Sequence, residues 1–310
     1  MRLPGRVTMV EVGARDGLQN EPVVVPAAVK ARLIELLAAA GLTVIEAGAF
    51  VSPRAVPQMA DTAAVLALLP PMPGRRRPVL VPNLTGYRHA VAAGAGEVAV
   101  LSAASEEFCQ ANLGCSQERS LERAGDIAVA ARRDGIAVRG YVSCALGCPY
   151  RGAVAPEAVV RVARRLADLG AAEISLGDTT GIGTPGRAQA MVDAVAAAIP
   201  VERLAAHFHD TRGQALANVL AVLECGVAVI DSSVAGLGGC PFAPGAAGNV
   251  ASEDVLYMLD GLAVETGVDL PSLVRAGWFI CDALGRTPRS KVSQALAGEG
   301  RQAQLRLSEE

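Results

Sequence analysis

Residues 137–176 read AVRGYVSCALGCPYRGAVAPEAVVRVARRLADLGAAEISL and contain one complete strand–helix–strand pattern. A short apolar run at 137–142 precedes an amphipathic segment at 156–169, in which apolar residues recur at helical spacing. Gly170 follows this segment directly, as a helix-ending glycine does, and a second apolar run begins at residue 173. The pattern predicts two strands joined by a helix.

The same alternation recurs along the whole chain and predicts a parallel sheet. Amphipathic segments at 27–40 and 214–224 also end close to a glycine, with Gly41 directly after the first and Gly226 two residues after the second. Eight parallel strands close a barrel, so the alternation predicts an α/β fold of the (β/α)8 TIM-barrel type. An open doubly wound sheet is the alternative, but no Gly-x-Gly-x-x-Gly motif follows the first run. The eight apolar runs span residues 7–12, 43–47, 78–82, 97–101, 137–142, 173–176, 204–208 and 228–231.

The chain shows no internal division. No Ser/Pro-rich linker interrupts it, and 310 residues lie within the range of a single barrel. We therefore expect one catalytic domain over residues 1–310. Residues from about 260 to 310 read as helical and predict an extension packed on the barrel.

The hydropathy of the chain suggests a membrane protein, but its pattern does not. Mean hydropathy is +0.34 and 51% of residues are hydrophobic, although only 3% are aromatic. A membrane-spanning helix needs about 20 consecutive apolar residues. The longest uncharged stretch, residues 232–252, is interrupted by seven glycine or proline residues. The chain starts with neither an apolar signal core nor an amphipathic presequence, so we expect a soluble, cytoplasmic protein with no membrane partner.

Charge and cysteine content indicate which kinds of partner and which redox compartment to expect. The formal net charge is −3 and no basic face is apparent, which argues against nucleic acid as a partner. The seven cysteines include no Cys-x-x-Cys pair and match no zinc spacing. Reduced thiols in a reducing compartment fit this pattern best.

Polar residues occur where the predicted strands end. In a barrel of this type, catalytic residues lie at the carboxyl ends of the strands. Most of the predicted strand ends are followed by residues whose side chains can take part in catalysis or ligand binding. They are Glu11 with the segment 14–21, Glu46, Asn83, Ser143 with Cys144, Asp178 with Thr179 and Thr180, His207 with His209 and Asp210, and the loop 238–241 with Asn249 beyond it.

The His207-x-His209 pair is the strongest single indication of chemistry. Residues two apart on a strand face the same side, so both imidazoles point to one place. Asp16 and Asn249, from other strand ends, would add a carboxylate and an amide oxygen. Such a nitrogen and oxygen set without thiolate favours Mg²⁺ or Mn²⁺, with Zn²⁺ and Co²⁺ as open alternatives. A hydrogen-bonded pair of core histidines is the alternative to a metal site.

Four further residues are candidates for catalysis, and most have a structural alternative. Arg15 would present its guanidinium to a developing oxyanion, or it forms only a local ion pair in a turn. Glu46 ends an apolar strand, where an unpaired buried carboxylate is costly. Asp178 precedes Thr-Thr-Gly and is either an acid of the site or a helix cap. Cys240 lies in a glycine-rich loop of the kind that closes over substrates, although most cysteines are inert core residues.

Six segments of the chain together resemble the hydroxymethylglutaryl-CoA lyase family. That family consists of metal-dependent enzymes in a (β/α)8-barrel superfamily that includes isopropylmalate and homocitrate synthases. The resemblance covers about residues 7–284, and the Gly-Leu-Gly-Gly-Cys-Pro loop at 236–241 distinguishes the lyase branch. The segments are VEVGARDGLQNE (10–21), FVSPRAVPQMADT (50–62), RGYVSCALGCPYRG (139–152), EISLGDTTGIGTPG (173–186), HFHDTRGQALAN (207–218) and DSSVAGLGGCPFAPGAAGN (231–249).

The resemblance implies a role for each candidate residue. The implied ligands of a divalent Mg²⁺ or Mn²⁺ ion are Asp16, His207, His209 and Asn249. The implied catalytic residues are Arg15, Cys240, and the supporting acids Glu46 and Asp178, together with His207. Either His207 or Asp178 would relay the hydroxyl proton. The implied substrate-binding residues are Arg15, Gln19 and Asn112, although segment 108–112 lacks the basic residues that relatives carry there.

The resemblance also implies a reaction. This is a retro-Claisen cleavage of 3-hydroxy-3-methylglutaryl-CoA to acetyl-CoA and acetoacetate, as in leucine catabolism and ketone body formation, by a homodimer. One alternative is a lyase for a longer branched 3-hydroxyglutaryl-CoA of the isohexenyl type, because the small residues Ala47, Gly48 and Ala49 would widen the pocket. Another is a Claisen-condensing acyltransferase acting on a 2-oxo acid. A metal hydrolase and a non-catalytic metal-binding barrel are weaker alternatives.

Overall fold

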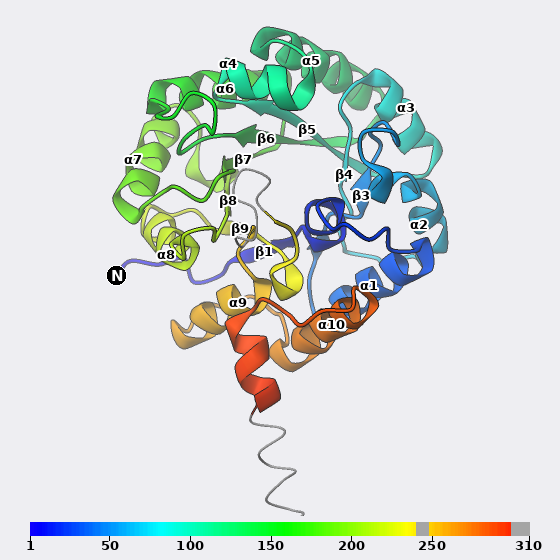
Figure 1. Ribbon diagram of the computed structural model, residues 1–310. Coiled ribbons are helices and arrows are strands. Elements are labelled where there is room, and N and C mark those ends of the chain that lie inside the picture. Colours follow the sequence, from blue (N-terminus) through cyan, green and yellow to red (C-terminus); the bar gives the residue numbers. More distant parts are fainter. Residues whose placement is uncertain (240–247, 299–310) are drawn as a thin grey trace, which may run out of the picture.

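The alternating segments fold into one parallel sheet that forms the centre of the computed structural model, which describes residues 1–239 and 248–298 (Figure 1). The strands lie in the order β2-β1-β9-β8-β7-β6-β5-β4-β3. They are β1 (Thr8–Glu11), β2 (Val44–Ile45), β3 (Gly48–Ala49), β4 (Val79–Leu80), β5 (Glu97–Ala103), β6 (Ala137–Ser143), β7 (Glu173–Asp178), β8 (Leu204–Phe208) and β9 (Val229–Ser232). Each of the eight predicted runs coincides with one strand position, because β2 and β3 occupy one position between them.

The shared position of β2 and β3 closes the sheet into a barrel. In β2, Val44 pairs with Val10 of β1, and in β3, Gly48 pairs with Val79 of β4. Between them, the Glu46 N–H donates to the carbonyl oxygen of Glu11 at 2.8 Å, and the Ala47 N–H donates to that of Pro78 at 2.9 Å. The predicted (β/α)8 barrel is therefore confirmed, and its carboxyl strand ends surround one opening.

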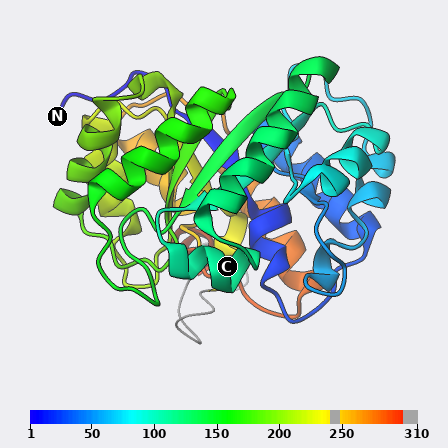
Figure 2. The same cartoon turned by 90° about the horizontal axis from the view of Figure 1, so that it is seen from above.

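Helices surround the barrel, as Figure 1 shows along its axis and Figure 2 from the side. The predicted helices at 27–40, 156–169 and 214–224 correspond to α1, α6 and α8. The helix α10 lies after residue 260 and contacts α1 and α9, and residues 291–298 are also helical. The helices are α1 (Ala27–Ala39), α2 (Thr62–Leu68), α3 (Leu84–Ala92), α4 (Glu106–Phe108), α5 (Gln117–Asp134), α6 (Pro156–Leu169), α7 (Pro185–Ala196), α8 (Ala215–Glu224), α9 (Ser252–Gly261) and α10 (Leu270–Ala283).

Among residues 1–239 and 248–298, no helix combines the length and the apolar character that crossing a membrane requires. The hydrophobic residues of the chain instead fill the barrel and the space between strands and helices, where the strands β5 to β9 are almost entirely buried.

The glycine that follows α1 is needed for its conformation and for its packing. Gly41 has a φ of +104°, in the left-handed region that other residues avoid. A Cβ added there would lie 2.2 Å from the carbonyl oxygen of Gly267, which belongs to the loop before α10. Gly41 thus allows the end of α1 and this loop to meet.

We predict that Gly41→Ala destabilises the protein more than the matched change Gly135→Ala. Gly135 also ends a helix with positive φ (+69°), but an added Cβ there meets no atom within 4 Å. Both variants carry the left-handed conformational cost of roughly 1–2 kcal/mol, and Gly41→Ala adds the steric clash. Urea denaturation of the two variants measures the difference. Equal losses of unfolding free energy would show that the contact with Gly267 relaxes without cost.

Two buried glutamates join β1, β9 and α9 beneath the opening of the barrel. Glu11 accepts hydrogen bonds from the N–H groups of Gly13 and Val234, at 2.7 and 2.9 Å. Glu253 accepts from the Ala235 N–H at 2.9 Å. Burial raises the pKa of Glu11 to about 7 and the pKa of Glu253 to about 8, despite these hydrogen bonds. Both carboxyl groups are therefore more easily protonated in the folded chain than in the unfolded chain.

This difference predicts that the metal-free protein loses stability as pH rises from about 5 to about 8. A raised pKa in the folded state means that the stabilisation is complete below the unfolded pKa and is lost as pH approaches the folded pKa. The loss approaches about 1.4 kcal/mol per pH unit for each such group. Glu253→Gln is neutral at every pH, so its unfolding free energy should decline less steeply over this range. Parallel pH dependences of the two proteins in urea denaturation would contradict the prediction.

Candidate active site

Asp16, His207 and His209 form a cluster at the opening of the barrel. Asp16 lies in a short π-helical turn (Gly13–Gly17) after β1, His207 lies in β8, and His209 follows β8 directly. One potential ligand atom from each residue lies within 4.8 Å of the others. The two Nε2 atoms are 3.4 Å apart, and the Nε2 of His207 lies 3.9 Å from Asp16 Oδ2. As expected from strand geometry, both imidazoles point to the same place.

The charge states of the cluster suit a divalent cation. Burial raises the pKa of Asp16, but the nearby charges of Arg15, His207 and His209 outweigh it and lower this pKa to about 2. Burial and the neighbouring His207 lower the pKa of His209 to about 4. Near neutral pH, the carboxylate is ionised and the imidazole of His209 is neutral, which are the forms that bind metals. These residues therefore fit a cation held by nitrogen and oxygen ligands.

Asn249 completes the set of residues around the cluster. Its backbone forms a bridge with that of His209, and its Nδ2 donates to Asp16 Oδ2 at 2.8 Å and to the carbonyl oxygen of Leu237 at 3.3 Å. Ligation would use the Oδ1 atom instead, so the amide would have to turn its oxygen toward the cation. The structure thus brings together all four residues that the sequence suggested as ligands.

Arg15 is held beside this cluster by two carboxylates. Its Nε donates to Glu46 Oε2 at 2.7 Å, and its Nη1 donates to Asp16 Oδ1 at 2.6 Å. Burial lowers the pKa of the guanidinium, but Glu46 and Asp16 outweigh this and raise it. Burial raises the pKa of Glu46, even though Arg15 opposes this effect, and Glu46 Oε1 has no hydrogen-bond partner in the described part of the chain. Arg15 is thus a permanent positive charge in a fixed orientation.

Three buried residues near the site were not identified from the sequence. The centre of the Tyr141 ring lies 5.5 Å from the guanidinium carbon of Arg15 and 4.8 Å from that of Arg139. Asp231 lies 3.3 Å from the Nδ1 of His207. Alternation along the predicted strand 137–142 puts Arg139 and Tyr141 on one face, and this pairing of a charge with an aromatic ring was an available signal.

The other predicted site residues have different surroundings. The carboxylate of Asp178 accepts the N–H groups of Ile182 and Gly183, at 3.2 and 2.8 Å, and therefore stabilises the loop after β7. Asp178 pairs with Phe208, so its side chain leaves the sheet on the face opposite to His207. Gln19 is half-buried beyond Asp16, and Asn112 is exposed in a turn that follows β5. Cys240 lies outside the described residues.

The small residues after Glu46 do not leave an empty space next to β3. A Cβ added to Gly48 would lie 2.6 Å from Thr62 Oγ1. The same hydroxyl donates to the Ala49 carbonyl oxygen at 3.0 Å. The side chain of Thr62 thus occupies the space that Gly48 leaves, and a wider acyl pocket would have to come from other residues.

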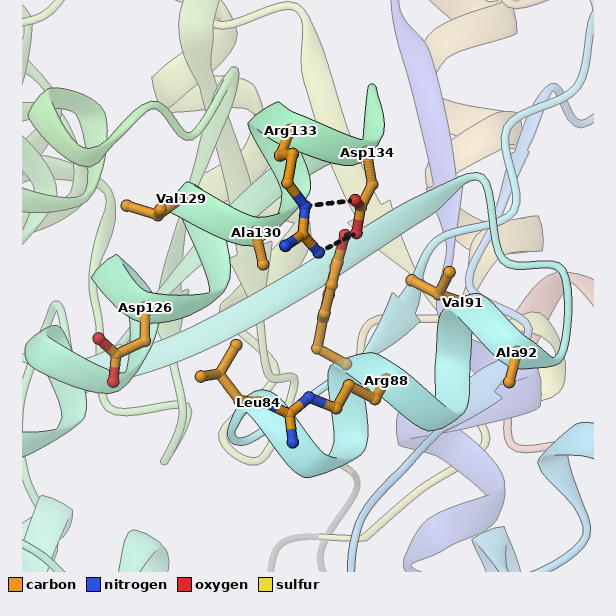
Figure 3. Close-up of a pocket in the computed structure, with 10 residues that line it drawn as sticks. Leu84, Arg88, Val91, Ala92, Asp126, Val129, Ala130, Arg133 and Asp134 are labelled. Carbon is orange, nitrogen blue, oxygen red and sulfur yellow. Dashed lines mark hydrogen bonds and ion pairs between the residues drawn. The ribbon is translucent and has the colours of Figure 1, made fainter.

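A groove of about 630 Å³ lies away from the cluster, on the outside of the barrel between α3 and α5 (Figure 3). Arg133 and the Tyr87 hydroxyl both hydrogen-bond to Asp134 in its wall, and the exposed Val129 lies at its edge. Its ten lining residues include none of the candidate site residues. The groove is therefore separate from the chemistry of the strand ends.

The fold and the cluster together define a (β/α)8-barrel enzyme with a candidate divalent-metal centre at the carboxyl ends of its strands. Residues 6–280 match the model of a protein family described as HMGL-like. The chain belongs to this family.

Curated relatives carry the names of hydroxymethylglutaryl-CoA lyases. The chain is 58% identical over 292 residues to "Hydroxymethylglutaryl-CoA lyase, mitochondrial" of Gallus gallus, which covers 94% of this chain and 98% of that protein. It is 58% identical over 294 residues to "3-hydroxy-3-methylglutaryl-CoA lyase, cytoplasmic" of Danio rerio, covering 95% of this chain and 88% of that protein. Relatives from both compartments are therefore about equally similar.

Solved structures lead to the same family. The hydroxymethylglutaryl-CoA lyase of Pseudomonas aeruginosa superposes with a TM-score of 0.95 at 55% identity, covering 96% of this chain and 100% of that chain. An HMG-CoA lyase from Acinetobacter baumannii, solved "in complex with coenzyme A and 3-methylmalate", gives a TM-score of 0.90 at 35% identity, covering 94% and 95%. The carboxyl transferase domain of Rhizobium etli pyruvate carboxylase, at 19% identity and a TM-score of 0.71, shares the fold.

The cluster predicts measurable metal binding that depends on His209. We expect chelator-stripped protein to bind Mn²⁺, and His209→Gln to weaken this binding by at least about 100-fold, because a ligand change costs more than the 10–100-fold of a neighbouring residue. His89→Gln is the matched control, since His89 is exposed in α3. Electron paramagnetic resonance titration of free Mn²⁺ measures both affinities. Equal affinities of the two variants would contradict a metal site at the cluster.

Proposed function

We propose that this protein is a carbon–carbon lyase that cleaves 3-hydroxy-3-methylglutaryl-CoA to acetyl-CoA and acetoacetate. Relatives bearing this name share more than half of their residues with the chain over nearly its whole length. The observation that carries the proposal is the position of Arg15, whose Nη1 lies 2.6 Å from Asp16 in the Asp16–His207–His209 cluster. This arrangement puts a fixed cation next to a candidate metal centre.

The residues that would hold the cation are Asp16, His207, His209 and Asn249. Their nitrogen and oxygen atoms favour Mg²⁺ or Mn²⁺. When bound, such a cation polarises substrate oxygen atoms and makes the 3-hydroxyl group more acidic. The side chains of Asp16 and His207 are 14% and 11% exposed, so the cluster is accessible to a small acyl group.

The cleavage requires Arg15 at the thioester end of the substrate. The 3-hydroxyl loses its proton to a base, the C2–C3 bond breaks, and C3 becomes the ketone carbon of acetoacetate. The bonding electrons pass to C2 and the thioester carbonyl, which forms the enolate of acetyl-CoA. Negative charge develops on the enolate oxygen, and Arg15, held in place by Glu46, would stabilise it.

Two proton transfers complete the reaction. We propose that His207 or Asp178 relays the hydroxyl proton to solvent, and that the Cys240 thiol protonates C2 of the enolate. Asp178 already accepts two backbone N–H groups, which favours His207 for direct contact with the reacting groups. Gln19, Arg15 and Asn112 are the proposed contacts to the acyl-CoA substrate.

The assembly and the compartment belong to the same proposal. We propose a homodimer of one-domain chains that acts in the cytoplasm on a small acyl-CoA. The resemblance to the lyase family supports the dimer, and a relative with a cytoplasmic name is 58% identical. A mitochondrial relative is equally similar, so the location rests on the sequence expectation.

The test of this function is release of acetoacetate from 3-hydroxy-3-methylglutaryl-CoA by protein reloaded with Mg²⁺ or Mn²⁺. We expect metal-dependent release, and a loss of about 10²–10³-fold in kcat for Arg15→Lys, because lysine cannot pair with Glu46 and also face the enolate oxygen. Arg76→Lys is the matched control, since Arg76, like Arg15, pairs with two carboxylates, but it lies at the amino-terminal side of β4.

The outcomes separate the candidate functions. Absence of metal-dependent acetoacetate release would contradict the proposed lyase. Faster cleavage of an isohexenyl-branched substrate would assign the longer-chain activity, and release of free CoA from acetyl-CoA with a 2-oxo acid would indicate a synthase. Equal rates for Arg15→Lys and Arg76→Lys would remove Arg15 from the mechanism.

A further inference from the structure

The two histidines of the cluster differ in what their second ring nitrogen contacts. The Nδ1 of His207 lies 3.3 Å from Asp231 Oδ2 in the barrel interior. The Nδ1 of His209 is buried and has no hydrogen-bond partner among the described residues. Because a neutral imidazole carries its proton on only one nitrogen, such a contact decides which nitrogen keeps a free lone pair. His207 has this constraint and His209 does not.

Asp231 is itself fixed by groups that can only donate to it. Arg139 donates to Asp231 Oδ1 and Oδ2, at 2.6 and 3.0 Å, in a bidentate ion pair. The Ser175 hydroxyl donates to Oδ2 at 2.8 Å. Both side chains of the ion pair are fully buried, so water does not compete with it. The carboxylate of Asp231 therefore keeps its charge and its orientation.

Four neighbouring strands, β6 to β9, bring these groups together. In β8 and β9, His207 and Asp231 are paired directly, and Arg139 and Ser175 come from β6 and β7. An ionised carboxylate accepts hydrogen bonds and cannot donate them. The proton shared with His207 must then lie on Nδ1, which leaves the lone pair of Nε2 directed at Asp16 and His209.

We propose that Asp231 is a positioning residue of the active site, which sets the Nδ1–H tautomer of His207 and so directs Nε2 toward the cation. Arg139 and Ser175 hold Asp231 in the orientation that this requires. The inference rests on the proposed metal-dependent function and extends it to a residue that lies below the ligands, inside the barrel. Carboxylates in this position beside a ligand histidine typically change metal affinity by about 10–100-fold.

The tautomer can be read directly from the metal-free protein. The chain has three histidines, and His89 is exposed, so His89→Gln and His209→Gln assign the imidazole signals. Long-range ¹H–¹⁵N spectra at about pH 8.5, where imidazoles are neutral, report the protonated nitrogen of each ring. We expect His207 to carry its proton on Nδ1 alone, whereas His89 exchanges between both tautomers. A proton on the Nε2 of His207 would overturn the proposal.

A variant then tests whether Asp231 is the cause. In Asp231→Asn we expect Nε2 of His207 to become partly protonated and the Mn²⁺ affinity to fall about 10–100-fold. Arg76→Gln is the matched control, because it breaks ion pairs with Glu97 and Glu173 at the other end of the same network without touching Asp231. It should leave the tautomer unchanged and the affinity within about twofold. An unchanged tautomer and affinity in Asp231→Asn would also overturn the proposal.

Asp231→Asn leaves the buried Arg139 with less charge compensation and could therefore prevent folding, so a second variant is needed. The double variant Arg139→Met/Asp231→Asn removes both charges of the pair, a change that buried ion pairs often tolerate. It should show the same partly protonated Nε2. Failure of this proposal differs from failure of the proposed function: wild-type protein that releases acetoacetate with His207 protonated on Nε2 refutes the positioning role alone.

Discussion

The closure of the parallel sheet is the constraint on which the rest of this structure depends. The two hydrogen bonds from Glu46 and Ala47, to Glu11 and Pro78, connect the first and the third strand positions through the second. Once the sheet is closed, the carboxyl ends of all strands surround one opening, and residues far apart in the chain must face each other there. Glu46 has two structural roles, because its backbone N–H helps to close the barrel and its carboxylate holds Arg15.

The candidate active site depends on charges that compensate one another in a largely buried environment. Asp16 and Glu46 neutralise Arg15, and Asp231 and Glu173 neutralise Arg139. Between these two groups lie His207, which contacts Asp231, and the Tyr141 ring, which contacts both guanidinium groups. Buried charges of this kind are costly unless they are paired. Here the pairs also hold Arg15 and Asp231 in fixed orientations beside the Asp16–His207–His209 cluster.

The fold and much of the candidate site could be predicted from the sequence. The eight apolar runs and the glycines after the helices were enough to predict the barrel, because the length of a strand and the end of a helix are local properties of the sequence. The His-x-His spacing gave two candidate ligands for the same reason, since residues two apart on a strand share a face. The ion pair of Asp231 with Arg139 was missed because it joins β6 and β9 across 92 positions of the chain, and no local pattern reveals such a pairing.

The sequence by itself therefore determined which elements form, their order, and the identity of the residues at the strand ends, all of which follow from short-range periodicity and residue type. Only the tertiary structure decided which of those residues meet. It brought Asp16, His207, His209 and Asn249 to one point beside Arg15. It directed the carboxylate of Asp178 toward the backbone N–H groups of the loop that follows β7. The physical reason is that contact between distant residues depends on the closure and register of the sheet, which exist only once all the strands are paired.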